Sequence, residues 1–288
     1  MDLTNYTEVT ALLRRHGFHF SKSLGQNFLT AAWVPERIAD EALLGPEDGV
    51  LEVGPGVGCL TEQLSDRAGK VLCLELDRRL EGVLAETLEG RDNVEIVFAD
   101  AARSDLSALC REHLGRRPWK VCANLPYNVT TPLLTAFLEA ECFESVTVMV
   151  QKEVAERMCA APGGKDYGAF TLLVQWYAEP ELLFTVPPHC FVPQPKVTSA
   201  VVRLTRRTAP PAEVESRDFF FRTVRAAFAQ RRKTLPNALM AGFPGLDRAG
   251  AEACAEAVGL SPMARGETLS LRQFAALSDA VSRRLGGS

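Results

Sequence analysis

Short β-rich runs alternate with helical segments over residues 49–204, and this alternation constrains the fold more than any other feature. Strands that alternate with helices form parallel, doubly wound sheets. Two later strands, 181–186 and 199–205, have no long helix between them, so we expect them to form an antiparallel edge. The five earlier runs, each followed by a helical or turn segment, lie at 50–53, 70–76, 94–98, 119–124 and 145–150.

The chain changes character after the last predicted strand. A stretch rich in proline, alanine and charged residues (205–215) resembles a linker, and the remainder is helical in pattern. We therefore predict an α/β domain at 1–206 and a small all-α domain at 207–288. Within the second domain we expect two helices that are broken near Leu235 and Pro236.

Composition is that of an ordinary globular protein. The 288 residues are 47% hydrophobic and 24% charged, which is enough for a full core. No apolar run reaches the roughly 18 residues that a membrane helix needs, and the first residues lack the pattern of a secretory signal. We expect a soluble, cytoplasmic monomer without a membrane partner.

The cysteines and histidines do not form a metal-binding pattern. Neighbouring cysteines among the eight are at least 12 residues apart, so the chain has no C-x-x-C pair, and only four histidines are present. We expect buried, reduced thiols and no metal site.

Charge is distributed unevenly along the chain. The net charge is −4, but residues 190–288 hold 15 Lys/Arg and 8 Asp/Glu, a net of +7. Residues 1–189 hold the other 17 and 28, a net of −11. RNA binding depends on a local basic field rather than on the total charge, so the C-terminal part is the candidate for that role.

The strongest local motif is VLEVGPGVGCLTEQL at residues 50–64. A strand is followed by a turn through Gly54, Gly56 and Gly58 and then by a helix. Glycines allow positive φ and a close approach of the backbone to a ligand. A dinucleotide fingerprint needs a glycine five residues after the first, where this chain has Cys59. The spacing favours a nucleoside-plus-amino-acid ligand, S-adenosylmethionine; the alternative is a purely structural turn.

Two acidic residues follow the next strands. Glu75 lies 21 residues after Gly54 at the end of the second strand, where such sheets place a ribose-binding carboxylate. Asp100 follows the third strand and is suited to the exocyclic amine of the cofactor adenine. Either acid alone would be interpreted as a solvated loop residue. Their order after the glycine turn favours a cofactor site.

The segment NLPYN (124–128) follows the fourth strand and is the catalytic candidate. An adenine amine is a poor nucleophile, so an enzyme must accept hydrogen bonds from the amine and hold its nitrogen in line with the methyl group. The side-chain oxygen of Asn124 and the backbone carbonyl of Leu125 are suitable acceptors. Pro126 stiffens the turn, and Tyr127 offers a ring for base stacking. The alternative is an Asn/Pro turn with a core tyrosine.

NLPYN, together with SLGQNFL (23–29), resembles the bacterial 16S ribosomal RNA adenine dimethyltransferases, the family linked to kasugamycin sensitivity. The resemblance implies a Rossmann-like class I S-adenosylmethionine methyltransferase. Its implied reaction dimethylates two adjacent adenosines in the 3′-terminal hairpin of 16S rRNA within the 30S subunit, with a role in ribosome biogenesis. The likeness runs through MVQKEVAERM (149–158), KDYGAF (165–170), FVPQPKVTSAVVRL (191–204), AFAQRRKTLPNAL (227–239) and LSPMARGETLSLRQF (260–274).

The resemblance also assigns residues. Asn27 and Leu29 are implied cofactor contacts that only the resemblance supplies. Phe191 resembles a second aromatic wall that faces Tyr127 across the target adenine; the alternative is a core phenylalanine. The full set of expected cofactor contacts is Asn27, Leu29, Gly54, Gly56, Glu75, Asp100 and Asn124.

A basic run near the C-terminal part is the predicted RNA-contacting surface. We place QRRK (230–233) on a helix, where Arg222, Arg225 and Arg232 share one face. Charge runs are usually solvated faces, and that alternative stays open. The predicted phosphate contacts are Arg222, Arg225, Arg231, Arg232 and Lys233, which Lys22, Lys196 and Arg203 could extend.

Three other functions compete with this prediction. The 23S ribosomal RNA dimethylases of macrolide resistance share the chemistry, but they typically carry N-I-P-Y and lack the AFAQRRKT and MARGETLS segments. A ribosome-assembly factor with vestigial activity would not need an intact NLPY with all cofactor carboxylates. A nicotinamide dehydrogenase is disfavoured by the glycine spacing.

Overall fold

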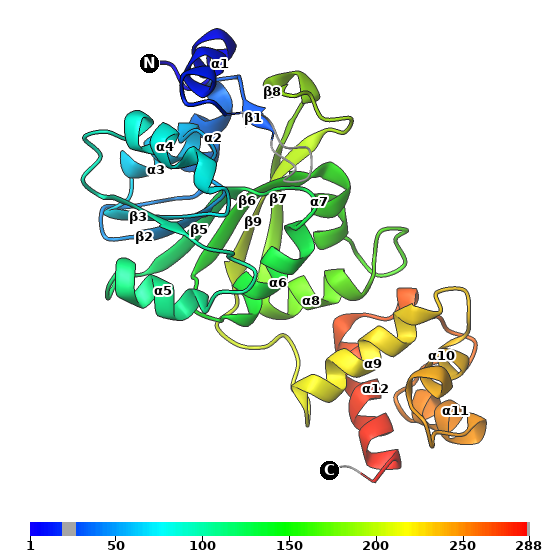
Figure 1. Cartoon of the computed structure of the whole chain (residues 1–288). Coiled ribbons are helices and arrows are strands. Elements are labelled where there is room, and N and C mark those ends of the chain that lie inside the picture. Colours follow the sequence, from blue (N-terminus) through cyan, green and yellow to red (C-terminus); the bar gives the residue numbers. More distant parts are fainter. Residues whose placement is uncertain (19–26, 287–288) are drawn as a thin grey trace. The chain divides into compact units, whose positions relative to one another are not determined.

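The computed structural model of the chain describes residues 1–18 and 27–286 (Figure 1). They form two compact units, the first from 1–155 and 179–206 and the second from 156–178 and the residues after 206. Residues 156–178, which we predicted in the first domain, belong to the second unit because α8 (Ala169–Tyr177) places Leu172 and Trp176 in its core. The division into domains at 206 and 207 stays a prediction.

A seven-stranded sheet forms the centre of the first unit. The strands from β2 to β6 run parallel, and β9 runs antiparallel to β6, with β7 beyond it at the edge. Helices connect the parallel strands, which confirms the predicted Rossmann-like α/β class. In spatial order the strands are β4 (Val94–Phe98), β3 (Lys70–Glu75), β2 (Gly49–Val53), β5 (Trp119–Asn124), β6 (Ser145–Gln151), β9 (Ser199–Arg206) and β7 (Ala178–Val186).

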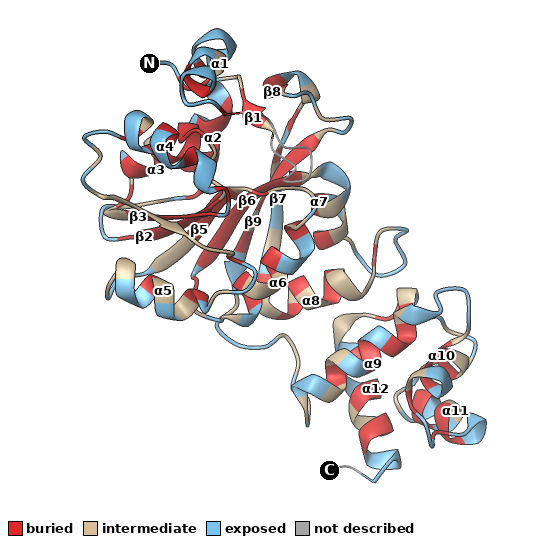
Figure 2. Cartoon of the chain, in the orientation of Figure 1, coloured by how far each residue is buried: buried red, intermediate tan, exposed pale blue. Residues whose placement is uncertain are grey.

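Helices cover both faces of this sheet. In Figure 1, α2, α3 and α4 lie on one face and α5 and α6 on the other. The central strand β2 is buried along its whole length, as a strand covered on both faces must be (Figure 2). The helices of the unit are α1 (Tyr6–Arg15), α2 (Trp33–Glu41), α3 (Cys59–Ser65), α4 (Glu81–Thr87), α5 (Leu106–His113), α6 (Thr130–Glu139) and the start of α7 (Lys152–Met158), with short 3₁₀ turns at Arg78–Leu80 and Pro188–Cys190.

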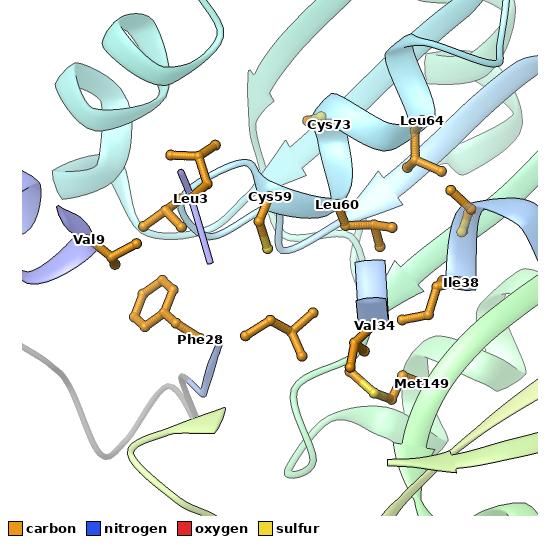
Figure 3. Packing of buried hydrophobic residues seen from close by; sticks show 14 of the residues in the cluster. Leu3, Val9, Phe28, Val34, Ile38, Cys59, Leu60, Leu64, Cys73 and Met149 are labelled. Atoms are coloured by element: carbon orange, nitrogen blue, oxygen red, sulfur yellow. The ribbon is translucent and has the colours of Figure 1, made fainter. Parts of the chain in front are cut away.

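An apolar core joins the N-terminal elements to the sheet. Figure 3 shows Val34 and Ile38 of α2 beside Leu60 of α3 and Met149 of β6. A two-stranded ladder of β1 (Phe28–Leu29) and β8 (Phe191–Val192) lies outside the main sheet. Through β1, this core holds the N-terminal segment near the end of β2.

The second unit is helical. Its described residues include α8, the 3₁₀ turn Gly266–Thr268, and four further helices whose inward faces are aromatic and aliphatic. Trp176 packs against Phe220, with ring centroids 4.5 Å apart. Pro236 lies in the first turn of a helix, where proline is well tolerated, so the predicted break falls before it, at 230–234. The helices are α9 (Arg217–Ala229), α10 (Leu235–Gly242), α11 (Arg248–Ala257) and α12 (Leu271–Arg284).

Over the described residues, every helix is too short or too polar to cross a membrane.

We expect the Trp176–Phe220 contact to stabilise the helical unit. Phe220 is fully buried, so Phe220→Ala should lower the free energy of unfolding by about 3–5 kcal/mol. Met263 is 75% exposed, and Met263→Ala should change it by less than about 0.5 kcal/mol. Urea titration followed by tryptophan fluorescence measures both, and equal effects would contradict the assigned core.

Candidate active site

The glycine turn between β2 and α3 opens the space in which the site lies. Gly54, Gly56 and Gly58 have φ of 72°, 62° and 92°, a left-handed conformation that side chains rarely adopt. A Cβ on Gly56 would lie 3.2 Å from the ring of Phe28. Both the backbone conformation and the close approach of Phe28 therefore require glycine at position 56.

A cavity of about 240 Å³ lies against this turn, far larger than the roughly 10–15 Å³ that one water needs. The carboxyl ends of β2, β3, β4 and β5 contribute to it, as expected for a ligand site in an open α/β sheet. All the residues predicted to bind the cofactor or to catalyse line the cavity, although their roles stay predictions: Asn27, Leu29, Gly54, Gly56, Glu75, Asp100, Asn124, Leu125, Pro126 and Tyr127.

Glu75 is held rigidly at the end of β3. Its side chain is 6% exposed, and its Oε1 accepts a hydrogen bond from the backbone N–H of Asp77 at 2.8 Å. Burial raises the pKa of this carboxyl, while backbone hydrogen bonds, including one from Gly56, oppose the shift. A fixed, poorly solvated carboxylate is well suited to accept hydrogen bonds from neutral hydroxyl groups.

Asp100 follows β4 and is more open. Its Oδ1 accepts a hydrogen bond from the backbone N–H of Ala102 at 3.0 Å, and its Oδ2 lies 3.5 Å from Nε of Arg103. The backbone contact orients the carboxylate at the rim of the cavity.

The NLPY segment presents two hydrogen-bond acceptors. The N–H of Leu125 donates to the carbonyl of Met149 at 3.1 Å, which fixes the turn against β6. Thr130 and Val129 both donate to the carbonyl of Pro126. Among the described residues, by contrast, no hydrogen bond occupies the Asn124 side chain or the Leu125 carbonyl. Both predicted acceptors are therefore available to a ligand.

Tyr127 is oriented by a residue of β9, the strand that follows β6 in the sheet. Its hydroxyl lies 2.5 Å from Oγ of Ser199, the first residue of β9. Burial raises the pKa of the Tyr127 phenol, so the ring is neutral at physiological pH. Sequence reasoning did not find Ser199, because nothing in the sequence pairs a serine with a tyrosine 72 residues away.

Phe191 is buried away from the lining of this cavity. It lies in β8, opposite Leu29 of β1, and is 2% exposed. It packs as a core phenylalanine here, and its role as a wall beside the target adenine stays a prediction. An apolar ring that pairs with the N-terminal strand is buried by that pairing.

The prediction that the basic run QRRK (230–233) lies on a helix is wrong. Helix α9 ends at Ala229, and residues 230–233 form a turn before α10, so Arg232 does not continue the α9 face. Arg222 and Arg225 are on α9 and exposed. The guanidinium of Arg222 lies 4.6 Å above the ring of Phe243.

Arg231 has partners within its own unit. Its Nε lies 3.1 Å from a carboxylate oxygen of Glu267, and its Nη2 donates to the carbonyls of Lys165 at 2.6 Å and Tyr167 at 3.1 Å. Arg232 and Lys233, by contrast, are exposed, and their side chains contact no partner among the described residues. Arg231 thus ties three segments together, and its neighbours extend into solvent.

The other basic residues considered as extensions of the surface differ. Arg203 is bound to Glu181 at 2.6 Å and to the carbonyl of Glu41 at 2.9 Å, which leaves it little capacity for a phosphate. Lys196 is exposed. Lys22 lies outside the described residues.

One buried acid of the cavity was not assigned from sequence. Glu52 of β2 lines the cavity and is 1% exposed. Its Oε2 accepts hydrogen bonds from Oγ1 of Thr61 at 2.7 Å and from Sγ of Cys73 at 3.6 Å. The signal in the sequence was a single carboxyl within the apolar run VLEV. Among the described residues, the cavity does not contain a cluster of three or more ligands suited to a metal ion.

Comparison with known proteins gives consistent similarities. The sequence profile of the family described as "Ribosomal RNA adenine dimethylase" matches residues 17–276. A protein of Geobacillus thermodenitrificans named "Ribosomal RNA small subunit methyltransferase A" is 47% identical over 284 residues, 97% of each chain. A protein of the same name from Moorella thermoacetica is 48% identical over 274 residues, 93% of this chain and 94% of the other.

Solved structures extend the similarity to the fold. The 23S rRNA methyltransferase ErmE superposes with a TM-score of 0.68 at 30% identity, covering 88% of this chain and 99% of that one. A dimethyladenosine transferase from Plasmodium falciparum superposes with a TM-score of 0.70 at 25% identity, covering 86% and 95%.

The tight packing at Gly56 can be tested by comparing alanine substitutions at Gly56 and at Gly90, the matched control. Gly56→Ala and Gly90→Ala both place a side chain at positive φ, 62° and 79°, which costs about 1–2 kcal/mol. Gly56→Ala also brings a Cβ against Phe28, whereas no atom of the described residues lies within 4 Å of a Cβ added at Gly90. We expect the larger loss in the free energy of unfolding for Gly56→Ala. Equal losses in urea titrations would show that the contact with Phe28 is not tight.

Proposed function

The chain belongs to the ribosomal RNA adenine dimethylase family, and from that premise we propose its reaction. It transfers methyl groups from S-adenosylmethionine to the exocyclic amines of two adjacent adenosines in the 3′-terminal hairpin of 16S rRNA, within the 30S subunit. The products are dimethyladenosines, and the role is in ribosome biogenesis in the cytoplasm. The observation that carries the proposal is the pair of free acceptors at Asn124 and Leu125 on the wall of a cavity lined by Glu75 and Asp100.

The residues present fit S-adenosylmethionine. A Cβ at Gly56 would crowd the ring of Phe28, which also lines the cavity, and no phosphate-binding lysine or arginine is among the described residues of that lining. Glu75 would accept hydrogen bonds from the ribose hydroxyls, and Asp100 would accept one from the adenine amine. Asn27 and Leu29 would hold the cofactor from the N-terminal segment. When bound, the cofactor supplies an electrophilic methyl group.

The chain's own residues would act by positioning and by accepting hydrogen bonds. The oxygens of Asn124 and Leu125 would accept hydrogen bonds from the two N–H groups of the target amine, which would hold the nitrogen in the geometry needed for attack. Tyr127, fixed through Ser199, would stack on the flipped base. No strong general base is required, because nitrogen loses a proton readily once it is alkylated.

The relatives favour the small subunit as substrate. Both curated relatives described above carry the name of a ribosomal RNA small subunit methyltransferase at 47% and 48% identity. The structural neighbour that acts on 23S rRNA is 30% identical. These similarities support the 16S assignment over the macrolide-resistance type.

Arg225, Arg232 and Lys233 are the proposed phosphate contacts, with Arg222 as a weaker member because its guanidinium also packs on Phe243. Exposed guanidinium and ammonium groups without partners are available for phosphate. The partners of Arg231 favour a structural role for that residue instead.

Catalysis should depend on Asn124. Asn124→Ala removes an acceptor whose hydrogen bond strengthens as the amine becomes pyramidal, so we expect turnover to fall by roughly 10²–10³-fold. Methyl transfer to unmethylated 30S subunits should be measured at saturating cofactor, with 30S binding followed by co-sedimentation. Binding should persist. Near-normal turnover would contradict the mechanism.

The two adjacent arginines should behave differently. Arg232→Ala with Lys233→Ala should weaken 30S binding and flatten the log-affinity against log-salt line by roughly 0.7–0.9 per lost phosphate contact. Arg231→Ala should instead lower the free energy of unfolding by about 1–2 kcal/mol, since it removes hydrogen bonds from a half-exposed charged group. Urea titration and salt-dependent co-sedimentation separate the two effects. An unchanged salt slope in the double variant would show that Arg232 and Lys233 do not contact RNA phosphates.

A further inference from the structure

The cavity is lined by acids without a compensating base. Three carboxyls, those of Glu52, Glu75 and Asp100, contribute to its wall. Over the described part of the chain, the lining contains no lysine, arginine or histidine. A cavity of this composition favours a positively charged ligand over a neutral one of the same shape.

Glu52 is the most enclosed of the three. At 1% exposure it has almost no contact with solvent, and its Oε2 receives hydrogen bonds from the hydroxyl of Thr61 and the thiol of Cys73. Its Oε1 has no hydrogen-bond partner among the described residues. A carboxylate in this position would be poorly compensated, because burying a charge is costly unless it is paired.

In the described part of the chain, no positively charged group acts on Glu52. Glu75 on β3 adds repulsion, and the thiols of Cys59, Cys73 and Cys122 come from α3, β3 and β5. Burial raises the pKa of all three thiols, so they stay neutral. Burial likewise raises the pKa of Glu52 to about 7, against the opposing effect of the hydrogen bonds from Thr61 and Cys73.

We infer that Glu52 carries a proton when the cavity is empty and releases it to solvent when a cationic ligand enters. The O–H bond of the carboxyl breaks, the carboxylate remains, and the positive charge of the ligand replaces that of the proton. Given the proposed function, the cationic ligand is S-adenosylmethionine, and its binding is coupled to the release of the Glu52 proton. S-adenosylhomocysteine, which lacks the sulfonium charge, should release fewer protons. Glu52 would thus help the site to distinguish cofactor from spent product.

The sign of the pH dependence follows from the raised pKa. Well below neutral pH, Glu52 is protonated in the empty protein, so binding releases close to one proton and affinity falls as pH falls. Well above neutral pH, it is already ionised, so binding releases none from this group. Affinity for S-adenosylmethionine should therefore rise through about pH 7 and then level off.

Titration calorimetry in buffers of different ionisation enthalpy counts the protons. Wild-type protein is titrated with S-adenosylmethionine and with S-adenosylhomocysteine between about pH 6 and pH 8.5. We expect proton release with the first ligand that diminishes across this range, and less release with the second. Glu52→Gln should lose most of the release and several-fold of the preference for S-adenosylmethionine. Thermal melting checks that this isosteric variant is folded.

Glu62→Gln is the matched control. Glu62 lies on α3, and burial also raises the pKa of its carboxyl, but it does not line the cavity. Its variant should release protons as the wild type does. Proton release that persists in Glu52→Gln would contradict the inference, because the proton would then come from another group such as Glu75. Wild-type binding of S-adenosylmethionine without proton release would also contradict it. Failure of the wild type to bind S-adenosylmethionine at all would instead contradict the proposed function.

Discussion

The left-handed turn after β2 is the constraint on which the rest of the site depends. Positive φ at Gly54, Gly56 and Gly58 turns the chain before α3 begins, and Gly54 and Gly56 line the cavity beside this turn. Because neighbouring strands run parallel, their carboxyl ends meet at this same edge. Residues distant in sequence, such as Glu75 and Asn124, therefore line one cavity.

The site combines rigid backbone with poorly solvated acids. Glu75 is fixed by backbone hydrogen bonds, and the NLPY turn is fixed against β6 through Leu125. Rigid acceptors do not need to reorganise as charge develops on a substrate, and a poorly solvated setting strengthens their effect. The same poor solvation makes the Glu52 carboxylate costly in the empty cavity. Poor solvation of the cavity thus underlies both the strength of the fixed hydrogen-bond acceptors and the proton that we infer on Glu52.

Sequence patterns predicted the sheet, the glycine turn and the strand-end residues because each depends on local spacing. The two-residue strand β8, which contains Phe191, was not predictable, since it pairs with another two-residue strand, β1. The end of α9 at Ala229 was also missed, because QRRK has good helix formers and the turn depends on Arg231 reaching Glu267. Long-range contacts of this kind leave no periodic signal in the sequence.

The identity of the modified base distinguishes the proposed reaction from its alternatives, and nucleoside analysis of the product measures it. Purified protein, S-adenosylmethionine and 30S subunits from a strain that lacks this methylation are incubated, and the rRNA is digested for nucleoside mass spectrometry. We expect N6,N6-dimethyladenosine from 16S rRNA at two adjacent positions near the 3′ end. Methylation of 23S rRNA alone, or of a base other than adenine, would contradict it.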